Sequence, residues 1–216
     1  MVPRTLQAFA RRTAESLVAP LARRGIDPNA VTVSGFVLNL ITAAVLATGH
    51  LTTGGILLLL SGLFDMLDGA LARISKTETP FGAFLDSLLD RYSEAAILIA
   101  LLYVFIDRHN TPAAILVFAV AIGSILTSYA RARAEGLGVE SSVGIAPRPE
   151  RVMILGLGLL INGTTTIAAL VVLAVLTHFT VVQRLYHVWR AMHPRSEKLA
   201  AQEGKRQAAQ RRSTPS

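Results

Sequence analysis

Four aspartates stand in otherwise apolar stretches of this sequence. Asp65 and Asp68 are three residues apart, and Asp86 and Asp90 are four residues apart, so each pair would share one face of a helix. A carboxylate at the centre of a membrane helix costs roughly 2.5–3.5 kcal/mol on insertion scales. Packing alone does not account for four such costs, so these residues are candidates for chemistry.

The charge balance around these carboxylates indicates a bound divalent cation. The four acids have two bases close to them in the sequence, Arg73 and Arg91, so a deficit of two positive charges is left. Oxygen ligands suit hard ions such as Mg²⁺ or Mn²⁺, and a pair of such ions stabilises the attacking and leaving oxygens in phosphoryl transfer. Two other interpretations stay open from spacing alone. These are a cation or proton path through a transporter, and ion pairing inside a helix bundle.

The composition of the chain indicates a membrane protein. Its 216 residues are 52% hydrophobic and 16% charged, against about 25% charged residues in a typical soluble domain. The net charge is +7, but basic nucleic-acid-binding proteins are not this apolar, so no nucleic-acid partner is expected. The chain has no cysteine, which excludes disulfides, cysteine-ligated zinc, thiol nucleophiles and iron–sulfur clusters.

The hydropathy pattern predicts an all-α membrane protein with six transmembrane helices preceded by an amphipathic interfacial helix. The six spans cover residues 31–48, 54–74, 81–105, 112–132, 152–161 and 165–185. The longer spans reach the roughly 20 residues that cross a bilayer, whereas the fifth has to begin earlier, near residue 149. Three regions follow: a cytoplasmic juxtamembrane helix (1–26), the six-helix domain (27–190), and a basic, disordered cytoplasmic tail (191–216).

The distribution of basic residues orients this arrangement. With a cytoplasmic N-terminus, the outer loops near 50–53, 107–111 and 162–165 hold only Arg108, while the other 20 Lys and Arg lie on or near the cytoplasmic side. The positive-inside rule requires this asymmetry. Basic residues flank the apolar region 152–182 on both sides, so it must be a hairpin with its turn at Asn162-Gly163. The chain would be a multi-pass protein of the plasma membrane, with the acidic cluster on the cytoplasmic side.

The acidic segment matches a known signature at every position. It reads Asp65-x2-Asp68-Gly69-x2-Ala72-Arg73-x8-Gly82-x3-Asp86-x3-Asp90. This pattern of eight fixed residues over 26 positions resembles that of the CDP-alcohol phosphatidyltransferases. The six spans and the preceding amphipathic helix are also similar to that family, so the resemblance covers most of residues 1–190.

The resemblance implies a membrane enzyme that transfers a phosphatidyl group from CDP-diacylglycerol to an alcohol and releases CMP. Asp65, Asp68 and Asp86 would be metal ligands. Asp90 would be both a ligand of the second metal and the general base that accepts the proton of the attacking hydroxyl. Two Mg²⁺ ions, or Mn²⁺ in their place, would bridge the diphosphate. The family resemblance also implies a homodimer.

The same resemblance marks residues that would bind the CDP-lipid. Gly69 is small enough for the nucleotide to approach, Arg73 would pair with the diphosphate, and Thr79 lies in the following loop. Upstream, the matching residues are the consecutive Asn29, Ala30, Val31 and Thr32. Structural alternatives stay open: close helix packing at Gly69, pairing of Arg73 with Asp68, and an N-cap at Asn29.

Basic residues on the cytoplasmic side predict an anionic acceptor alcohol. Four residues near the ends of the fourth and fifth spans would bind its phosphate: Ser128, Arg131, Arg133 and Arg151. Arginine suits bidentate phosphate recognition, and an inward-facing basic pocket beside a metal site would hold a polyol phosphate. The alternative is that these arginines anchor the chain at lipid headgroups.

The residues around this pocket resemble the phosphatidylinositol-phosphate synthase branch of actinobacteria and its archaeal counterparts. The stretches are Ser128-Tyr129-x-Arg131-Ala132-Arg133-Ala134-Glu135 and Pro147-Arg148-Pro149-Glu150-Arg151. That branch uses inositol 1-phosphate; the alternative acceptor is glycerol 3-phosphate, as in a phosphatidylglycerophosphate synthase. The sequence departs from the branch at Arg131, where Lys is commoner, and at Glu94, where Asp is frequent. An ion-coupled transporter and a non-catalytic membrane scaffold are the other functional classes.

Overall fold

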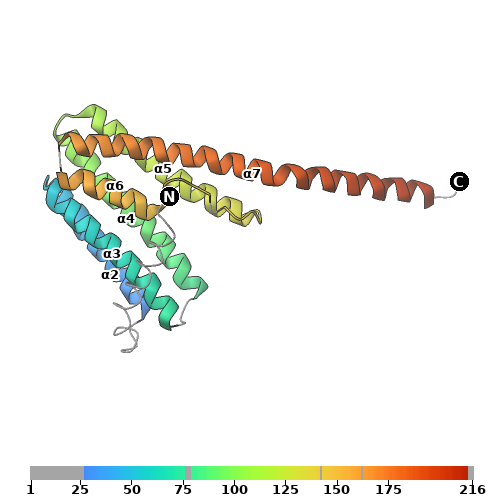
Figure 1. Cartoon of the computed structure of the whole chain (residues 1–216), viewed down its shortest axis with the longest axis horizontal. Coiled ribbons are helices and arrows are strands. Elements are labelled where there is room, and N and C mark those ends of the chain that lie inside the picture. Colours follow the sequence, from blue (N-terminus) through green and yellow to red (C-terminus); the bar gives the residue numbers. More distant parts are fainter. Residues whose placement is uncertain (1–26, 76–78, 142, 162, 214–216) are drawn as a thin grey trace, which may run out of the picture.

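The computed structural model describes residues 27–75, 79–141, 143–161 and 163–213, and the regular structure in this part of the chain is entirely helical (Figure 1). The helices are α2 (Pro28–Ala47), α3 (Leu51–Ser75), α4 (Pro80–Asp107), α5 (Thr111–Gly136), α6 (Arg148–Ile161) and α7 (Thr164–Ser213). The predicted all-α class is confirmed, and each predicted apolar span corresponds to one helix. The predicted interfacial helix of residues 1–26 falls outside the described residues.

Helices α2, α4 and α5 each begin with a polar cap and a proline in the first turn. The side chains of Asp27, Thr79 and Asn110 accept hydrogen bonds from first-turn backbone N–H groups, at 2.9, 2.9 and 3.2 Å respectively. Such a cap satisfies an N–H that has no partner inside the helix, and a proline there loses no hydrogen bond. Because Asp27 caps α2, the alternative that Asn29 is the cap is wrong.

The region 152–182 folds as the predicted hairpin. Helix α6 ends at Ile161 and α7 begins at Thr164, and Gly163 between them has a φ of +62°. Glycine adopts this left-handed conformation without a Cβ clash. Helix α6 begins at Arg148, before the apolar stretch, as the short length of that stretch required.

The described helices form a closed ring, in which each packs against two others in the order α2, α3, α6, α7, α5, α4 and back to α2. Although the connection between α3 and α4 is short, these two helices are not direct neighbours, because α2 lies between them. Ser61 of α3 donates a hydrogen bond to the buried Asn39 of α2 at 2.8 Å. At Gly35, α2 faces α3, since an added Cβ would lie 3.5 Å from Asp65 Oδ1, an ordinary van der Waals contact. These contacts pair α3 with α2 instead of with α4.

Helices α3 and α6 approach closely at two glycines. A Cβ at Gly55 would lie 2.7 Å from the backbone nitrogen of Leu160, and one at Gly156 would lie 2.6 Å from the side chain of Leu59. Larger residues at these positions would push the two helices apart. The contact holds α6 against α3, and the start of α6 therefore lies beside the acidic end of α3.

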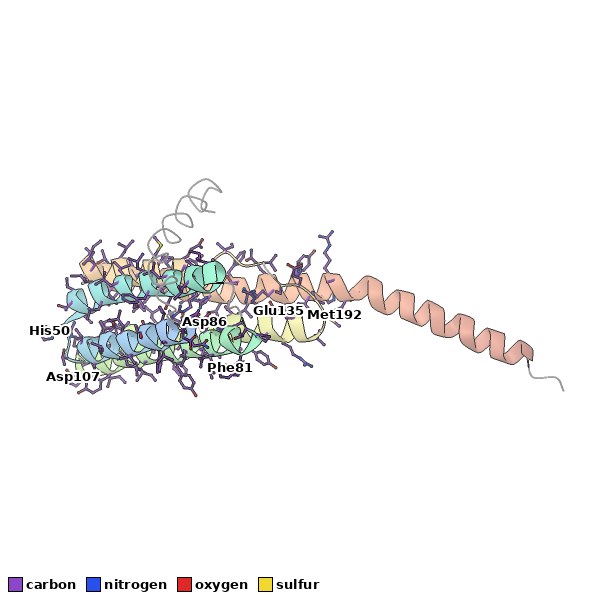
Figure 2. All side chains as sticks on the ribbon, turned by 90° about the horizontal axis from the view of Figure 1, so that it is seen from below. His50, Phe81, Asp86, Asp107, Glu135 and Met192 are labelled. Carbon is purple, nitrogen blue, oxygen red and sulfur yellow. The ribbon has the colours of Figure 1, made fainter. Side chains whose placement is uncertain are left out.

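The ring has an apolar end and a polar end. His50, in the α2–α3 connection, and Asp107, the last residue of α4, lie together at one end, and Asp86, Phe81 and Glu135 lie toward the other (Figure 2). Fully buried apolar side chains fill the ring toward the first end: Leu46, Leu101, Val117, Leu159, Leu170 and Leu173. Burying one such leucine stabilises a fold by roughly 1.5–3 kcal/mol, so this end supplies much of the packing energy.

In the described part of the chain, three helical segments are long and apolar enough to cross a membrane, namely α2, α5 and the Thr164–His193 part of α7, with mean hydropathy of 2.0 to 2.2. Helices α3 and α4 carry charged residues, and α6 has only 14 residues. The outer surface of the ring is also apolar, since Ile99, Ile115 and Val175 are 65%, 63% and 63% exposed. Large exposed apolar surfaces are rare on soluble monomers, so this surface fits a membrane protein.

Beyond the ring, α7 continues as one helix to Ser213 (Figure 1). The prediction of a disordered tail from residue 191 is therefore wrong for the backbone of residues 191–213. The physical reason is composition, because Ala, Gln, Glu, Lys and Arg dominate this segment and all five have high helix propensity.

Candidate active site

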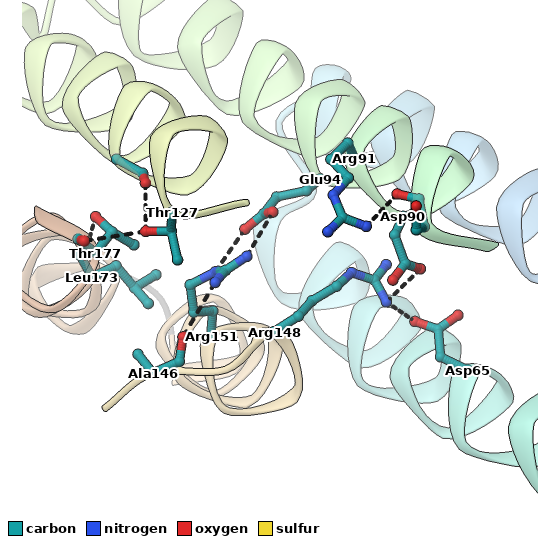
Figure 3. A network of polar contacts seen from close by, with 12 residues as sticks. Asp65, Asp90, Arg91, Glu94, Thr127, Ala146, Arg148, Arg151, Leu173 and Thr177 are labelled. Atoms are coloured by element: carbon teal, nitrogen blue, oxygen red, sulfur yellow. Dashed lines mark hydrogen bonds and ion pairs between the residues drawn. The ribbon is translucent and has the colours of Figure 1, made fainter. Parts of the chain in front are cut away.

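Asp65 of α3 and Asp90 of α4 meet through a third residue, Arg148 at the start of α6 (Figure 3). Arg148 Nη1 lies 2.5 Å from Asp65 Oδ2 and 2.8 Å from Asp90 Oδ1. The three side chains are between 19% and 23% exposed, so these charges are partly shielded from water. The acidic faces of α3 and α4 therefore meet at Asp65 and Asp90.

Asp86 lies one turn before Asp90 on α4, and its charge interacts with those of Arg148 and Asp65. Three of the four predicted metal ligands therefore share one site. The fourth, Asp68, belongs to α3, but its side chain lies outside the described residues. Among the side chains that are described, no three acids or histidines form a ready-made metal cluster, and the guanidinium of Arg148 contacts both Asp65 and Asp90.

The donor set nevertheless fits a divalent cation. Carboxylates from two helices converge on a single positive charge, and their oxygens are the ligands that Mg²⁺ and Mn²⁺ prefer. The charges of Arg148 and Arg91 both act on these acids, so three carboxylates face two guanidinium groups and one negative charge is left in excess. Partly buried like charges are unfavourable unless a cation balances them.

A second ion pair joins α6 to α4, one turn further along both helices than the pair between Arg148 and Asp90. Arg151 Nε and Nη2 donate to the two oxygens of Glu94, both at 3.0 Å, and Nη1 donates to the carbonyl of Ala146 at 3.2 Å (Figure 3). Arg151 is only 5% exposed, and this two-bond geometry makes a strong ion pair. In the described part of the chain α4 and α6 do not pack directly against each other, so both ion pairs cross the interior of the ring.

A polar cavity of 610 Å³ lies beside the acidic cluster. Its lining comes from α4, α5, α6 and α7 and includes Asp86, Asp90, Glu94, Ser128, Arg131, Arg148, Arg151 and Arg184. Three of the four predicted acceptor residues therefore surround one space. The fourth, Arg133, is exposed and is not among the lining residues. Two positions along a helix turn a side chain by about 200°, which points Arg133 away from the side of α5 that carries Arg131.

The sequence does not predict the surroundings of two arginines in this site, Arg148 and Arg184. The sequence groups Arg148 with the acceptor pocket, and 83 positions separate it from its partner Asp65. By sequence Arg184 is one of the basic residues at the cytoplasmic end of the last span, yet it is 8% exposed and lines the polar cavity. Its guanidinium donates to the carbonyls of Thr127 and Val143, the latter at 2.9 Å. The only signal in the sequence is that Arg184 comes at the end of the last apolar stretch, two positions after Val182.

A second cavity, of 250 Å³ and mostly apolar, lies between α3 and α6. Its lining includes Leu59, Leu63, Asp65, Arg148, Val152 and Met153. Arg148 and the adjacent Pro149 line both cavities. The acidic cluster therefore lies at the junction between an apolar space and a polar one.

The residues predicted to bind the CDP-lipid are partly described. Asn29 and Thr79 come together at the start of α4, because a Cβ at Gly82 would lie 3.0 Å from both Asn29 Oδ1 and Thr79 Oγ1. The next three residues, Ala30, Val31 and Thr32, belong to the first turns of α2. Gly69 and Arg73 belong to α3, but their surroundings fall outside the described residues.

The sequence is similar to known enzymes over most of its length. A family model described as CDP-alcohol phosphatidyltransferase matches residues 26–193. An archaetidylinositol phosphate synthase from Methanothermobacter thermautotrophicus is 41% identical over 187 residues, which cover 80% of this chain and 93% of that protein. A phosphatidylinositol phosphate synthase from Mycobacteroides abscessus is 35% identical over 189 residues, which cover 84% of this chain and 86% of that protein.

The fold is also similar to solved structures. The crystal structure of Mycobacterium tuberculosis phosphatidylinositol phosphate synthase with CDP-DAG bound matches with a TM-score of 0.76 and 33% identity, covering 82% of this chain and 94% of that one. The structure of the same mycobacterial protein in complex with manganese and citrate matches with a TM-score of 0.75 and 33% identity, covering 82% and 88% of the two chains. Sequence and fold comparisons therefore agree.

Proposed function

This chain belongs to the CDP-alcohol phosphatidyltransferase family, and on that basis we propose that it transfers a phosphatidyl group from CDP-diacylglycerol to inositol 1-phosphate, giving phosphatidylinositol phosphate and CMP. Its relatives include inositol phosphate synthases. One observation in this chain carries the proposal: the acidic cluster lies where an apolar cavity meets an arginine-lined polar cavity. A lipid donor and an anionic, water-soluble acceptor need this combination. Because the family consists of enzymes, the transporter and scaffold interpretations are set aside.

Asp90 is the general base of the proposed reaction. The hydroxyl oxygen of the acceptor attacks the phosphorus that carries the diacylglycerol, and the bond from this phosphorus to the CMP oxygen breaks, so that CMP leaves with the electron pair. Asp90 accepts the hydroxyl proton, because its carboxylate lines the polar cavity that would hold the acceptor. Two divalent cations held by Asp65, Asp68, Asp86 and Asp90 would offset the charge of the diphosphate when bound.

The lipid substrate approaches from the bilayer side of the ring. The apolar cavity between α3 and α6 suits an acyl chain, and Asp65 and Arg148 are part of its lining. The CDP headgroup would then lie across the starts of α2 and α4, where Asn29 and Thr79 are adjacent. We assign CDP-lipid contacts to Asn29, Ala30, Val31, Thr32, Gly69, Arg73 and Thr79.

The acceptor phosphate binds among Arg131, Arg151 and Arg184, with Ser128 adding a hydroxyl. Arg151 and Arg184 are held in place by hydrogen bonds to backbone carbonyls. Arg131 pairs with Glu135 at 2.8 Å, and both side chains are about half exposed, at 54% and 48%. An exposed pair of this kind is worth little, so Arg131 is free to turn toward a phosphate. Arg133 lies outside the cavity, and its exposed position at the end of α5 fits a lipid headgroup contact.

We further propose that all six helices cross the plasma membrane, with the site facing the cytoplasm, residues 1–26 forming the interfacial helix, and the enzyme acting as a homodimer. The outer connections hold one basic residue, Arg108, and the other 20 lie toward the opposite side, which supports this orientation. The 14 residues of α6 extend about 21 Å at 1.5 Å per residue, less than a hydrocarbon core of roughly 30 Å. The polar cavity at the start of α6 accounts for the missing length, because the backbone that precedes this helix borders the cavity and not the lipid.

An acceptor panel tests the proposed function. Purified protein in nanodiscs is incubated with CDP-diacylglycerol, Mg²⁺ and either inositol 1-phosphate, inositol or glycerol 3-phosphate, and released CMP is measured. We expect CMP with inositol 1-phosphate, no activity after chelation, and recovery with Mg²⁺ or Mn²⁺. The Asp65→Ala variant should not recover. Faster turnover with glycerol 3-phosphate would change the acceptor but not the family, whereas CMP release that survives chelation would overturn the metal site.

A further inference from the structure

Two arginines lie one turn apart on α6, and their hydrogen bonding differs. The guanidinium of Arg151 donates from Nε, Nη1 and Nη2, so all three of its nitrogens are satisfied. Arg148 makes both of its ion pairs through Nη1, and its Nε is buried without a hydrogen-bond partner in the described part of the chain. A buried donor without a partner is unfavourable, because it has given up its hydrogen bonds to water without gaining one in the protein. The guanidinium of Arg148 therefore uses less of its hydrogen-bonding capacity than that of Arg151.

The oxygens that hold Arg148 are those that a metal ion would need. Arg148 Nη1 contacts one oxygen each of Asp65 and Asp90, and Asp86 is close enough to interact with its charge. These acids come from the two helices whose carboxylates fit a divalent cation. A guanidinium and a divalent cation cannot share the same oxygens, because two cations at that separation repel each other strongly in a partly buried site.

We propose that Arg148 is an internal counter-ion that competes with the divalent cation: it balances Asp65 and Asp90 in the metal-free protein and leaves them when the metal binds. This inference rests on the proposed function, since it takes these carboxylates to be the metal ligands. Arg148 lines the 610 Å³ polar cavity as well as the apolar one, so its long side chain has space to turn out of the cluster.

The second ion pair makes such a movement compatible with the fold. Arg151 and Glu94 connect α6 to α4 independently of Arg148, and α6 is held by its packing against α3 and α7. The release of Arg148 breaks no close helix packing, because in the described part of the chain the backbones of α4 and α6 do not approach each other closely and the two helices meet through long side chains. Metal binding would therefore exchange one positive charge for another without rearranging the ring.

A metal titration without substrates tests this competition separately from catalysis. Binding of Mn²⁺ to the detergent-solubilised protein is measured by calorimetry for the wild type, Arg148→Gln and Arg148→Lys. Losing a charge-assisted contact costs roughly 1.5–3 kcal/mol, so removing the competitor should tighten Mn²⁺ binding by about ten- to a hundredfold. Arg148→Lys retains a charge but lacks the planar fork of arginine, so its affinity should fall between the other two. Arg190→Gln, an exposed arginine of α7, controls for the loss of one positive charge.

Thermal unfolding supplies a second readout that a purely structural role would not reproduce. Without metal, Arg148→Gln should melt below the wild type, because its carboxylates lose their counter-ion. With saturating Mn²⁺ this difference should largely disappear, so the metal-induced rise in melting temperature should be larger in the variant. If Arg148→Gln does not fold, Arg148→Lys tests the competition by itself. It should bind Mn²⁺ more tightly than the wild type and show a larger metal-induced rise in melting temperature.

Equal or weaker Mn²⁺ binding by the Arg148 variants would overturn the proposed competition, as would a melting difference that persists at saturating Mn²⁺. Failure of the proposed function looks different. In that case the wild type would release no CMP with any acceptor, whatever its Mn²⁺ affinity. The two proposals can therefore fail separately.

Discussion

The two ends of the helix ring are built from opposite kinds of side chain. Toward the end marked by His50 and Asp107, buried leucines and valines from every described helix, including Leu51 and Leu58 of α3, fill the interior. Toward the other end the helices enclose a 610 Å³ polar cavity, and ion pairs replace apolar packing between α4 and α6. The comparison indicates that the packed apolar end stabilises the fold. The polar end can therefore hold charged side chains and bind or release ligands without loss of the core.

The helices α4 and α6 connect the two ends. Leu101 of α4 and Leu159 of α6 are fully buried at the apolar end, whereas Asp90 and Arg148 of the same helices meet at the polar end. A substitution at the polar end of either helix should therefore affect mainly activity, and a substitution at the apolar end should affect mainly stability. Four substitutions test this separation.

The largest effect is expected for Asp90→Asn at the polar end. Loss of a general base lowers turnover by about 10²–10⁴-fold, while helical content and gel-filtration behaviour should stay close to those of the wild type. Asp107→Asn makes the same chemical change in the last residue of α4, at the apolar end, and should leave turnover unchanged. CMP release measures both. Near-normal turnover of Asp90→Asn would remove Asp90 from the mechanism.

Leu101→Ala at the apolar end should show the opposite pattern. Leu101 is fully buried, and truncating a buried leucine costs about 2–5 kcal/mol of unfolding free energy. Turnover per folded molecule should be retained. Denaturation in detergent measures the loss, with Ile99→Ala as the control, because Ile99 lies on the outer face of the same helix and is 65% exposed. Equal losses in the two variants would show that the ring interior is not the source of stability.

Arg151→Gln should affect the acceptor more than the lipid. Removing a charge-assisted contact costs roughly 1.5–3 kcal/mol, which corresponds to about one to two decades in affinity. The loss should appear in the KM for inositol 1-phosphate, because the phosphate is held alike in the ground and transition states. The variant also leaves Glu94 without its partner, so melting temperature is measured in parallel. An unchanged acceptor KM together with lowered stability would reduce Arg151 to a structural role.

The smallest effect is expected for Arg131→Gln, with Arg133→Gln as its matched control on the same helix. Arg131 lines the polar cavity but is 54% exposed, so we expect a rise in acceptor KM of up to about tenfold, at the lower end for a charge-assisted contact. Arg133 lies outside the cavity, and its variant should keep the wild-type KM. If the two variants raise the KM equally, the positive charge acts at long range and not through the cavity.

The sequence by itself determined the elements of the fold and the candidate chemistry. Helices α2, α4 and α5 begin where caps and prolines indicate, because these signals act within one turn of the chain. The spacing of Asp86 and Asp90 places both on one side of α4 for the same local reason. The chemistry of four carboxylates in an apolar setting also follows from residue type alone, since the two bases nearby in the sequence, Arg73 and Arg91, balance only half of their charge.

Only the tertiary structure decided which of these residues meet. Arg148 balances Asp65 from 83 positions away, α2 separates α3 from α4, and Arg133 is excluded from the cavity that Arg131 lines. None of these follows from spacing within a helix, which fixes the side on which a residue lies but not the neighbour it faces. That neighbour depends on which helices can approach closely, as α3 and α6 do at Gly55 and Gly156, and on ion pairs between residues far apart in the sequence.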